Sequence, residues 1–171
     1  GLLKAAIRDN DPVVFMESEQ MYGDKGEVPE GEYIIPIGVA DVVREGSHVT
    51  LVSFGKIMKK VKEAADLLAE EGIEADVIDL RTVRPIDYDT IISSVKKTNR
   101  LVIVEEAWPL ASLSSDIAFN VQRDAFDHID APVKRVCTAD VPMAYAPNLV
   151  EEFMPKVSKI VEEVKSVMYV K

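Results

Sequence analysis

The chain has too little cysteine and too little uninterrupted apolar sequence for several classes of protein. Cys137 is the single cysteine among 171 residues, which excludes an internal disulfide and a multi-cysteine metal site. No apolar run approaches the roughly 18 residues of a membrane-spanning helix, so we expect no membrane segment. The first residues also lack the basic-then-apolar layout of a signal peptide. These features predict an intracellular protein of a reducing compartment.

Positive charge is scarce as well. Twenty Lys and Arg residues stand against thirty Asp and Glu residues, which leaves a formal net charge of −10. A nucleic-acid surface needs clustered positive charge, so we expect no nucleic-acid partner. An acidic chain instead attracts basic partners. With 47% hydrophobic and 29% charged residues, the composition is that of a globular protein with enough apolar mass for a core.

The first 45 residues differ from the rest, with ten acidic residues against four basic ones. Their apolar run at 13–16 predicts a short buried strand, and the glycines and prolines between 23 and 36 are typical of a linker. One strand cannot build a core. We therefore expect residues 1–35 to be the end of a domain that begins upstream, or alternatively a tail packed on the domain at 36–171.

After residue 36 the pattern is regular. Apolar runs at 39–43 and 49–54, joined by a polar turn, predict an antiparallel hairpin. Further strands are predicted at 75–80, 101–105 and 133–137. Helices are predicted over 56–71, from the capping residue Asp87 to 97, from Ser112 or Ser114 to 123, and from near Pro155 onward. Strands that alternate with helices indicate a three-layer α/β/α fold whose sheet is mostly parallel, with one antiparallel strand.

The sequence offers no self-sufficient active site. Neither a G-x-G-x-x-G nor a G-x-x-x-x-G-K-[ST] motif occurs. The turn at 53–56 could hold an anion at a helix N-terminus, but an ordinary strand-to-helix turn is favoured. His48 and His128 have no nucleophile in a suitable context and are predicted to be surface residues. Cys137 follows a buried strand and is predicted to be an inert packing residue.

Two adjacent carboxylates, Glu105 and Glu106, follow the most apolar strand, at the edge where open α/β sheets gather ligands. Neighbouring strand residues point to opposite faces, so the pair is not expected to share a proton. We predict instead a structural ion pair with Arg81 or Arg84. A further polar cluster could line a pocket or form an exposed turn: Glu17, Glu19 and Tyr22.

Several strings of residues carry a family resemblance. The segments 4–17, 33–46 and 79–87, the last with an arginine–proline turn, resemble the β subunits of heterotetrameric 2-oxo acid dehydrogenase E1 components. The segment 139–146 resembles the pyruvate dehydrogenase members more than the branched-chain members. The resemblance covers essentially the whole chain. It implies that residues 1–35 are the tail of the pyrimidine-binding domain plus linker, and that residues 36–171 are a transketolase C-terminal domain.

The resemblance also implies a reaction for the whole enzyme. Pyruvate would be oxidatively decarboxylated with thiamine diphosphate and Mg, and the acetyl group would pass to the lipoyl arm of E2. The family's cofactor-activating glutamate is expected upstream of Gly1, and the diphosphate and metal are held mainly by the α subunit. No catalytic, cofactor-binding or metal-binding residue is therefore expected in this chain, and alone it should be inactive. The expected location is the bacterial cytoplasm or the mitochondrial matrix.

The implied partners are the E1 α subunit, a second β subunit and the basic peripheral subunit-binding domain of E2. The family's acidic docking contacts correspond to Asp127, Asp130 and the carboxylate at Lys171, and the subunit interface to the loop of Trp108, Pro109 and Leu110. Two alternatives remain open. The chain could belong to an E1 β subunit for branched-chain 2-oxo acids or acetoin, or it could be a purely structural assembly module.

Overall fold

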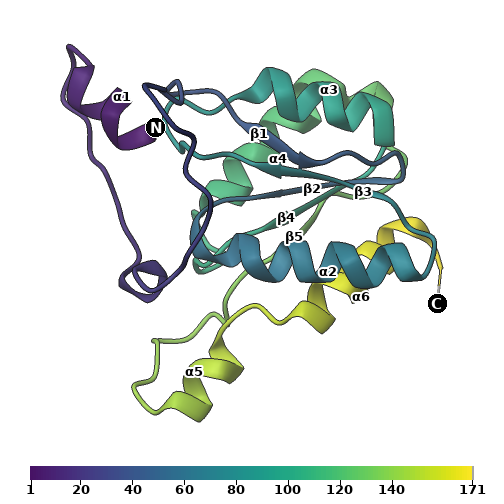
Figure 1. Cartoon of the computed structure of the whole chain (residues 1–171). Coiled ribbons are helices and arrows are strands. Elements are labelled where there is room, and N and C mark those ends of the chain that lie inside the picture. The colour runs from purple at the N-terminus through teal and green to yellow at the C-terminus, as the bar shows by residue number, and fades with distance from the viewer. Residues whose placement is uncertain (171) are drawn as a thin grey trace.

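A single five-stranded sheet forms the centre of the structure (Figure 1). The computed structural model describes residues 1–170. The strands are β1 (Asp41–Arg44), β2 (Val49–Ser53), β3 (Ala75–Asp79), β4 (Leu101–Val104) and β5 (Lys134–Val136). Their order is β1-β3-β2-β4-β5, and every neighbouring pair is parallel except β1 with β3. The predicted mostly parallel sheet with one antiparallel strand is confirmed.

The predicted hairpin between the first two strands is wrong, because β3 lies between β1 and β2. The turn that joins β1 to β2 is bound to the start of β3. The Gly46 N–H donates to Oδ1 of the buried Asp76 at 2.9 Å, and the His48 N–H donates to the Glu74 carbonyl at 3.0 Å. A Cβ at Gly46 would overlap the backbone of Ala75, so only glycine allows this close crossing.

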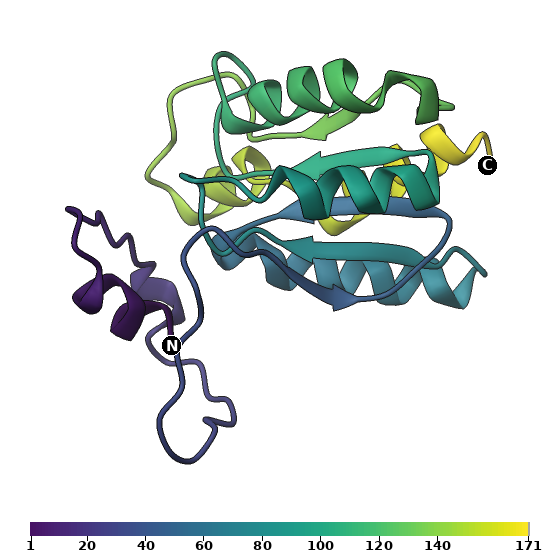
Figure 2. The ribbon, with the colours of Figure 1, turned by 90° about the horizontal axis from the view of Figure 1, so that it is seen from above.

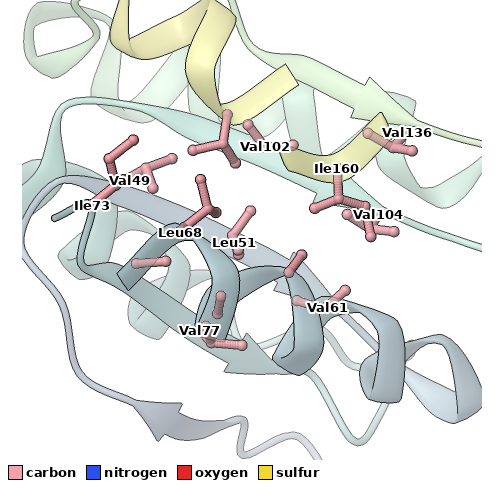
Figure 3. Packing of buried hydrophobic residues seen from close by; sticks show 14 of the residues in the cluster. Val49, Leu51, Val61, Leu68, Ile73, Val77, Val102, Val104, Val136 and Ile160 are labelled. Atoms are coloured by element: carbon pink, nitrogen blue, oxygen red, sulfur yellow. The ribbon is translucent and has the colours of Figure 1, made fainter. Parts of the chain in front are cut away.

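Helices cover both faces of the sheet (Figures 1 and 2). Helices α2 (Met58–Glu70) and α6 (Val157–Met168) pack on one face, and α3 (Tyr88–Thr98) and α4 (Leu113–Ala125) on the other. Figure 3 shows Leu68 of α2 and Ile160 of α6 beside Leu51 and Val102 of the central strands. Because every residue of β2 and β4 is buried, both faces need a helical layer.

The predicted inward faces of the helices are confirmed. Val61 and Leu68 of α2, Ile91 of α3 and Ile160 of α6 are fully buried. Asp87 caps α3 as predicted, with Oδ1 accepting from the Thr90 N–H at 3.0 Å. The helix predicted near Pro155 begins at Val157. A short helix, α5 (Pro147–Phe153), was not predicted and projects away from the sheet (Figure 1).

None of the first 40 residues is buried, and of these only Ala40 is among the partly buried apolar residues packed against the core. Residues 1–40 contain α1 (Leu2–Arg8) and a 3₁₀ turn, η1 (Glu19–Met21). Two further 3₁₀ turns lie later in the chain, among the strands and helices of the sheet domain: η2 (Gly55–Ile57) and η3 (Phe126–His128). The buried strand predicted at 13–16 is wrong. Val14 and Met16 are 88% and 85% exposed, because no strand in residues 1–170 pairs with this segment. No helix in residues 1–170 is long and apolar enough to cross a membrane.

Two adjacent leucines of α2 test the helical layer. Leu68 is fully buried, whereas Leu67 is 43% exposed. We expect Leu68→Ala to lower the free energy of unfolding by about 2–5 kcal/mol, because it leaves a cavity between α2 and the sheet. Leu67→Ala should cost much less in the same urea titration. Equal losses for the two variants would contradict this packing.

Asp87 gives a prediction that depends on pH. Burial tends to raise the pKa of Asp87, but hydrogen bonds from the Ala40 N–H and from the Thr90 N–H and hydroxyl outweigh it and hold the pKa below its ordinary value. The folded state therefore favours the carboxylate. The resulting stabilisation is complete above the ordinary aspartate pKa of about 3.9 and is lost as pH falls through the lowered pKa of the folded state.

At neutral pH we expect Asp87→Ala to lower the free energy of unfolding by about 1–2 kcal/mol. The difference from wild type should shrink in acid, as measured by urea titration at several pH values. Asp89→Ala is the matched control, since Asp89 is exposed in the same helical turn. The capping role would be contradicted if wild type and Asp87→Ala differed by the same free energy of unfolding at every pH, including pH values below the lowered pKa of Asp87.

Candidate functional site

The topology separates two groups of loops. Each helix crosses back over the sheet before the next parallel strand begins, so loops that follow strands meet at the carboxyl edge of the sheet. Loops that follow helices meet at the opposite, amino edge. The candidate residues divide accordingly: Glu105, Glu106 and Trp108 follow β4 at the carboxyl edge, whereas Asp127 and Asp130 precede β5 at the amino edge.

At the carboxyl edge, two pairs of charged side chains neutralise one another. Lys56 Nζ lies 2.8 Å from Glu106 Oε1 and also donates to Gln20 Oε1 at 3.2 Å. Arg81 pairs with Asp41 of β1. The predicted pairing of Glu105 or Glu106 with Arg81 or Arg84 is therefore wrong. The lysine of the 53–56 turn is occupied by a carboxylate, which agrees with an ordinary strand-to-helix turn.

Glu105 has a structural partner that the sequence did not indicate. Its side chain is 1% exposed, and Oε1 accepts from both the N–H, at 3.2 Å, and the hydroxyl of Ser114, in the first turn of α4. Cys137 Sγ lies 3.7 Å from the same oxygen, and burial raises the pKa of this thiol. A carboxylate at a helix N-terminus is favoured by the helix dipole, so Glu105 fixes the start of α4. The raised pKa supports the prediction that Cys137 is an inert packing residue.

The histidines and the N-terminal polar cluster form no catalytic group. His48 Nδ1 accepts from the Glu74 N–H at 2.8 Å, which closes the turn before β2, and His128 is exposed. The Tyr22 hydroxyl donates to Glu17 Oε2 at 2.7 Å in an exposed turn. These side chains have structural or surface roles in the described chain.

A shallow pocket of about 410 Å³ lies along the free edge of β5, lined in part by Lys134, Thr138 and Lys159. Both lysines pair with Glu163, at 3.3 Å from Lys134 Nζ and 3.0 Å from Lys159 Nζ. Burial tends to raise the pKa of Glu163, but the two lysines outweigh it and lower that pKa. The charges of these two lysines are therefore compensated, whereas Arg135, which also lines the pocket, donates to a backbone carbonyl and to serine hydroxyls.

The loop after β4 exposes large apolar side chains. Trp108 is 52% exposed and Leu110 is 81% exposed. The Trp108 Nε1–H donates to the Val141 carbonyl at 2.9 Å, and Arg135 Nη1 donates to the Pro109 carbonyl at 2.9 Å. The first bond joins this loop to a second exposed apolar segment, which sequence reasoning missed: Val141, Met143, Tyr145 and Leu149. We refer to these residues together with Trp108, Pro109 and Leu110 as the apolar surface.

The amino edge carries the acidic loop, defined as residues 126–131. Asp127 and Asp130 are exposed, as the docking prediction requires. Asp124, on α4 nearby, differs from them because Arg123 pairs with it at 2.5 Å; this hydrogen bond lowers the pKa of Asp124. Lys171, the third predicted docking contact, lies outside the described residues. The docking roles of Asp127, Asp130 and Lys171 and the interface roles of Trp108, Pro109 and Leu110 stay predictions.

The fold defines a class of protein: a three-layer α/β/α domain whose sheet is mostly parallel with one antiparallel strand. More specifically, the chain belongs to the transketolase C-terminal domain family, whose model matches residues 38–160. A solved structure titled "Split gene transketolase, inactive beta4 tetramer" superposes with a TM-score of 0.73 at 29% identity, covering 85% of this chain and 47% of that one.

Curated relatives agree with this family. The pyruvate dehydrogenase E1 component subunit beta of Dictyostelium discoideum is 50% identical over 98% of this chain, and that of Rickettsia felis is 49% identical over 99%. The acetoin:2,6-dichlorophenolindophenol oxidoreductase subunit beta of Cupriavidus necator is 44% identical over 98%. The chain spans about half the length of these relatives: 48%, 52% and 50% in that order.

Proposed function

We propose that this chain is the C-terminal part of the β subunit of a pyruvate dehydrogenase E1 component. A single observation carries the proposal: along nearly the whole chain, about half of the residues are identical to those of pyruvate dehydrogenase β subunits. Residues 1–35 would be the tail of the preceding pyrimidine-binding domain plus linker, and residues 36–171 the transketolase C-terminal domain. The lack of any buried residue in the first 40 supports that division.

In the whole enzyme, thiamine diphosphate with Mg would supply the chemistry of pyruvate decarboxylation. The residues described here do not fit that cofactor. At the carboxyl edge, Lys56 and Arg81 are paired with carboxylates, and no group of three or more metal-binding side chains occurs in residues 1–170. We propose that this part serves assembly and docking, with catalysis completed by the rest of the β subunit and by the α subunit. The isolated chain would be inactive, and the location would be the bacterial cytoplasm or the mitochondrial matrix.

An acetoin-oxidising enzyme is the second candidate, because acetoin oxidoreductase β subunits are 44% and 49% identical to the chain. Substrate profiling of the assembled α/β enzyme separates the two candidates. Oxidation of pyruvate with acetyl transfer to lipoyl-E2 supports the proposal. Activity with acetoin alone would contradict it.

The apolar surface would be the contact with a second β subunit. A C2 interface uses the same patch on both copies, and exposed aromatic and aliphatic side chains favour such an interface. Leu110, at 81% exposed, contributes little to the fold itself.

We therefore expect Leu110→Ser to weaken β–β association, measured by analytical ultracentrifugation, while the melting temperature stays within a few degrees of wild type. Leu67→Ser, on the outer face of α2, is the control and should associate like wild type. Unchanged association in the Leu110 variant would remove this loop from the interface.

The acidic loop would bind the basic peripheral subunit-binding domain of E2. Asp127 and Asp130 are exposed and unpaired with any base among the described residues, so their charge is available to a partner. Opposite charges steer association and are screened by salt.

Truncation of one member of a desolvated charge pair costs roughly 2–5 kcal/mol, so Asp130→Ala should weaken binding of the subunit-binding domain at least tenfold. Calorimetry on the assembled α/β enzyme measures this loss, which should shrink as salt rises. Asp124→Ala is the matched control, because Arg123 already compensates that carboxylate. Wild-type affinity in the Asp130 variant would show that the docking site lies elsewhere.

A further inference from the structure

The backbone of the acidic loop is fixed on both sides of Asp130. Ile129 packs against the core between α3, α4 and the sheet, and Ala131 is 5% exposed. The Ile129 N–H also donates to the Phe126 carbonyl at 3.1 Å, within the η3 turn. These anchors leave the carboxylate of Asp130 exposed while the chain beneath it is held.

Asn99 holds this loop from the end of α3. It occupies the C-cap position in the left-handed conformation, with φ of 61°, which asparagine tolerates better than most residues. Its Nδ2 donates to the His128 carbonyl at 2.9 Å, and its own carbonyl accepts from the Asp130 N–H at 2.9 Å. One residue thus fixes the backbone at two points, two residues apart.

Tyr169 holds the same loop from the end of α6. It too is a left-handed C-cap, with φ of 57°, and the next N–H, of Val170, donates back to the Lys165 carbonyl at 3.1 Å. The Tyr169 hydroxyl donates to the Asp130 carbonyl at 3.3 Å. Side chains from two helix ends therefore meet at the backbone of one acidic loop.

We propose that Asn99 and Tyr169 are positioning residues for E2 docking: they hold Asp130 in the geometry that the basic partner recognises. This inference rests on the proposed docking function. A carboxylate on a fixed backbone loses less conformational freedom on binding than one on a mobile loop, so the complex is tighter without any added contact. Neither residue contributes charge to the surface; both act through Asp130.

The test uses the assembled α/β enzyme and the isolated basic subunit-binding domain of E2 as the probe. The variants are Asn99→Gly, which keeps the left-handed cap but removes the amide, and Tyr169→Phe, which removes only the hydroxyl. Each is also combined with Asp130→Ala. Tyr22→Phe makes the same chemical change in the N-terminal segment and serves as control.

We expect each single variant to weaken binding about three- to tenfold, the loss typical of the one hydrogen bond that it removes. Net charge is unchanged, so the slope of affinity against salt should stay at the wild-type value, whereas Asp130→Ala should reduce it. In the Asp130→Ala background, neither variant should weaken binding further, because a positioning residue acts only through the group that it positions. Tyr22→Phe should bind like wild type.

Three outcomes would overturn the inference. Asp130→Ala binding like wild type would remove the docking function itself. A tenfold loss in Asp130→Ala together with wild-type affinity in both single variants would leave docking in place and remove only the positioning role. Additive losses in the double variants would show direct contact or a general structural effect. Tyr169→Phe keeps the test valid even if Asn99→Gly lowers the melting temperature.

Discussion

Burial of both faces of the two central strands is the constraint on which the rest of the structure depends. Every residue of β2 and β4 is buried, so the sheet is stable only with α2 and α6 on one face and α3 and α4 on the other. Parallel strands covered in this way need a helix to return the chain after each strand. The ends of strands and the ends of helices are therefore separated to opposite edges of the sheet.

This separation gives the two edges different chemistry. At the carboxyl edge, two ion pairs form within the domain, among them Lys56 with Glu106, and apolar side chains such as Trp108 and Leu110 are exposed. At the amino edge, helices α3 and α6 end beside the acidic loop, where helix dipoles place partial negative charge next to Asp130. These differences support the proposed association of subunits at the first edge and the proposed basic partner at the second.

The sequence predicted the features that depend on local pattern. The apolar spacing of Val61 and Leu68 gave the inner face of α2, and Asp87 was recognised as a cap because its side chain acts within one helical turn. Strand order was not predictable in the same way. The turn after β1 is joined to the start of β3 by a hydrogen bond between Gly46 and Asp76, which are 30 residues apart. The spacing of apolar residues along the sequence does not reveal such a long-range contact.

In the candidate sites, too, contacts between residues far apart in the sequence could not be predicted. The exposure of Asp127 and Asp130 followed from their polar context, but the residues that hold the loop, Asn99 and Tyr169, are separated from Asp130 by 31 and 39 residues. The partner of Glu105 was missed because Ser114 reaches it only after the loop at 106–112 folds back over β4. The resemblance to β subunits supplied the docking hypothesis; the structure shows which residues hold the loop that carries Asp127 and Asp130.

Hydrogen–deuterium exchange of the assembled α/β enzyme, with and without the basic subunit-binding domain of E2, tests the central claim most directly. Backbone amides report protection by a partner or by a more stable local structure. We expect slower exchange on binding in peptides that cover residues 126–133 and 166–170, with no change over 105–113 and 137–147. Protection at the carboxyl-edge segments without any change at the acidic loop would contradict the assignment of the amino edge as the docking surface.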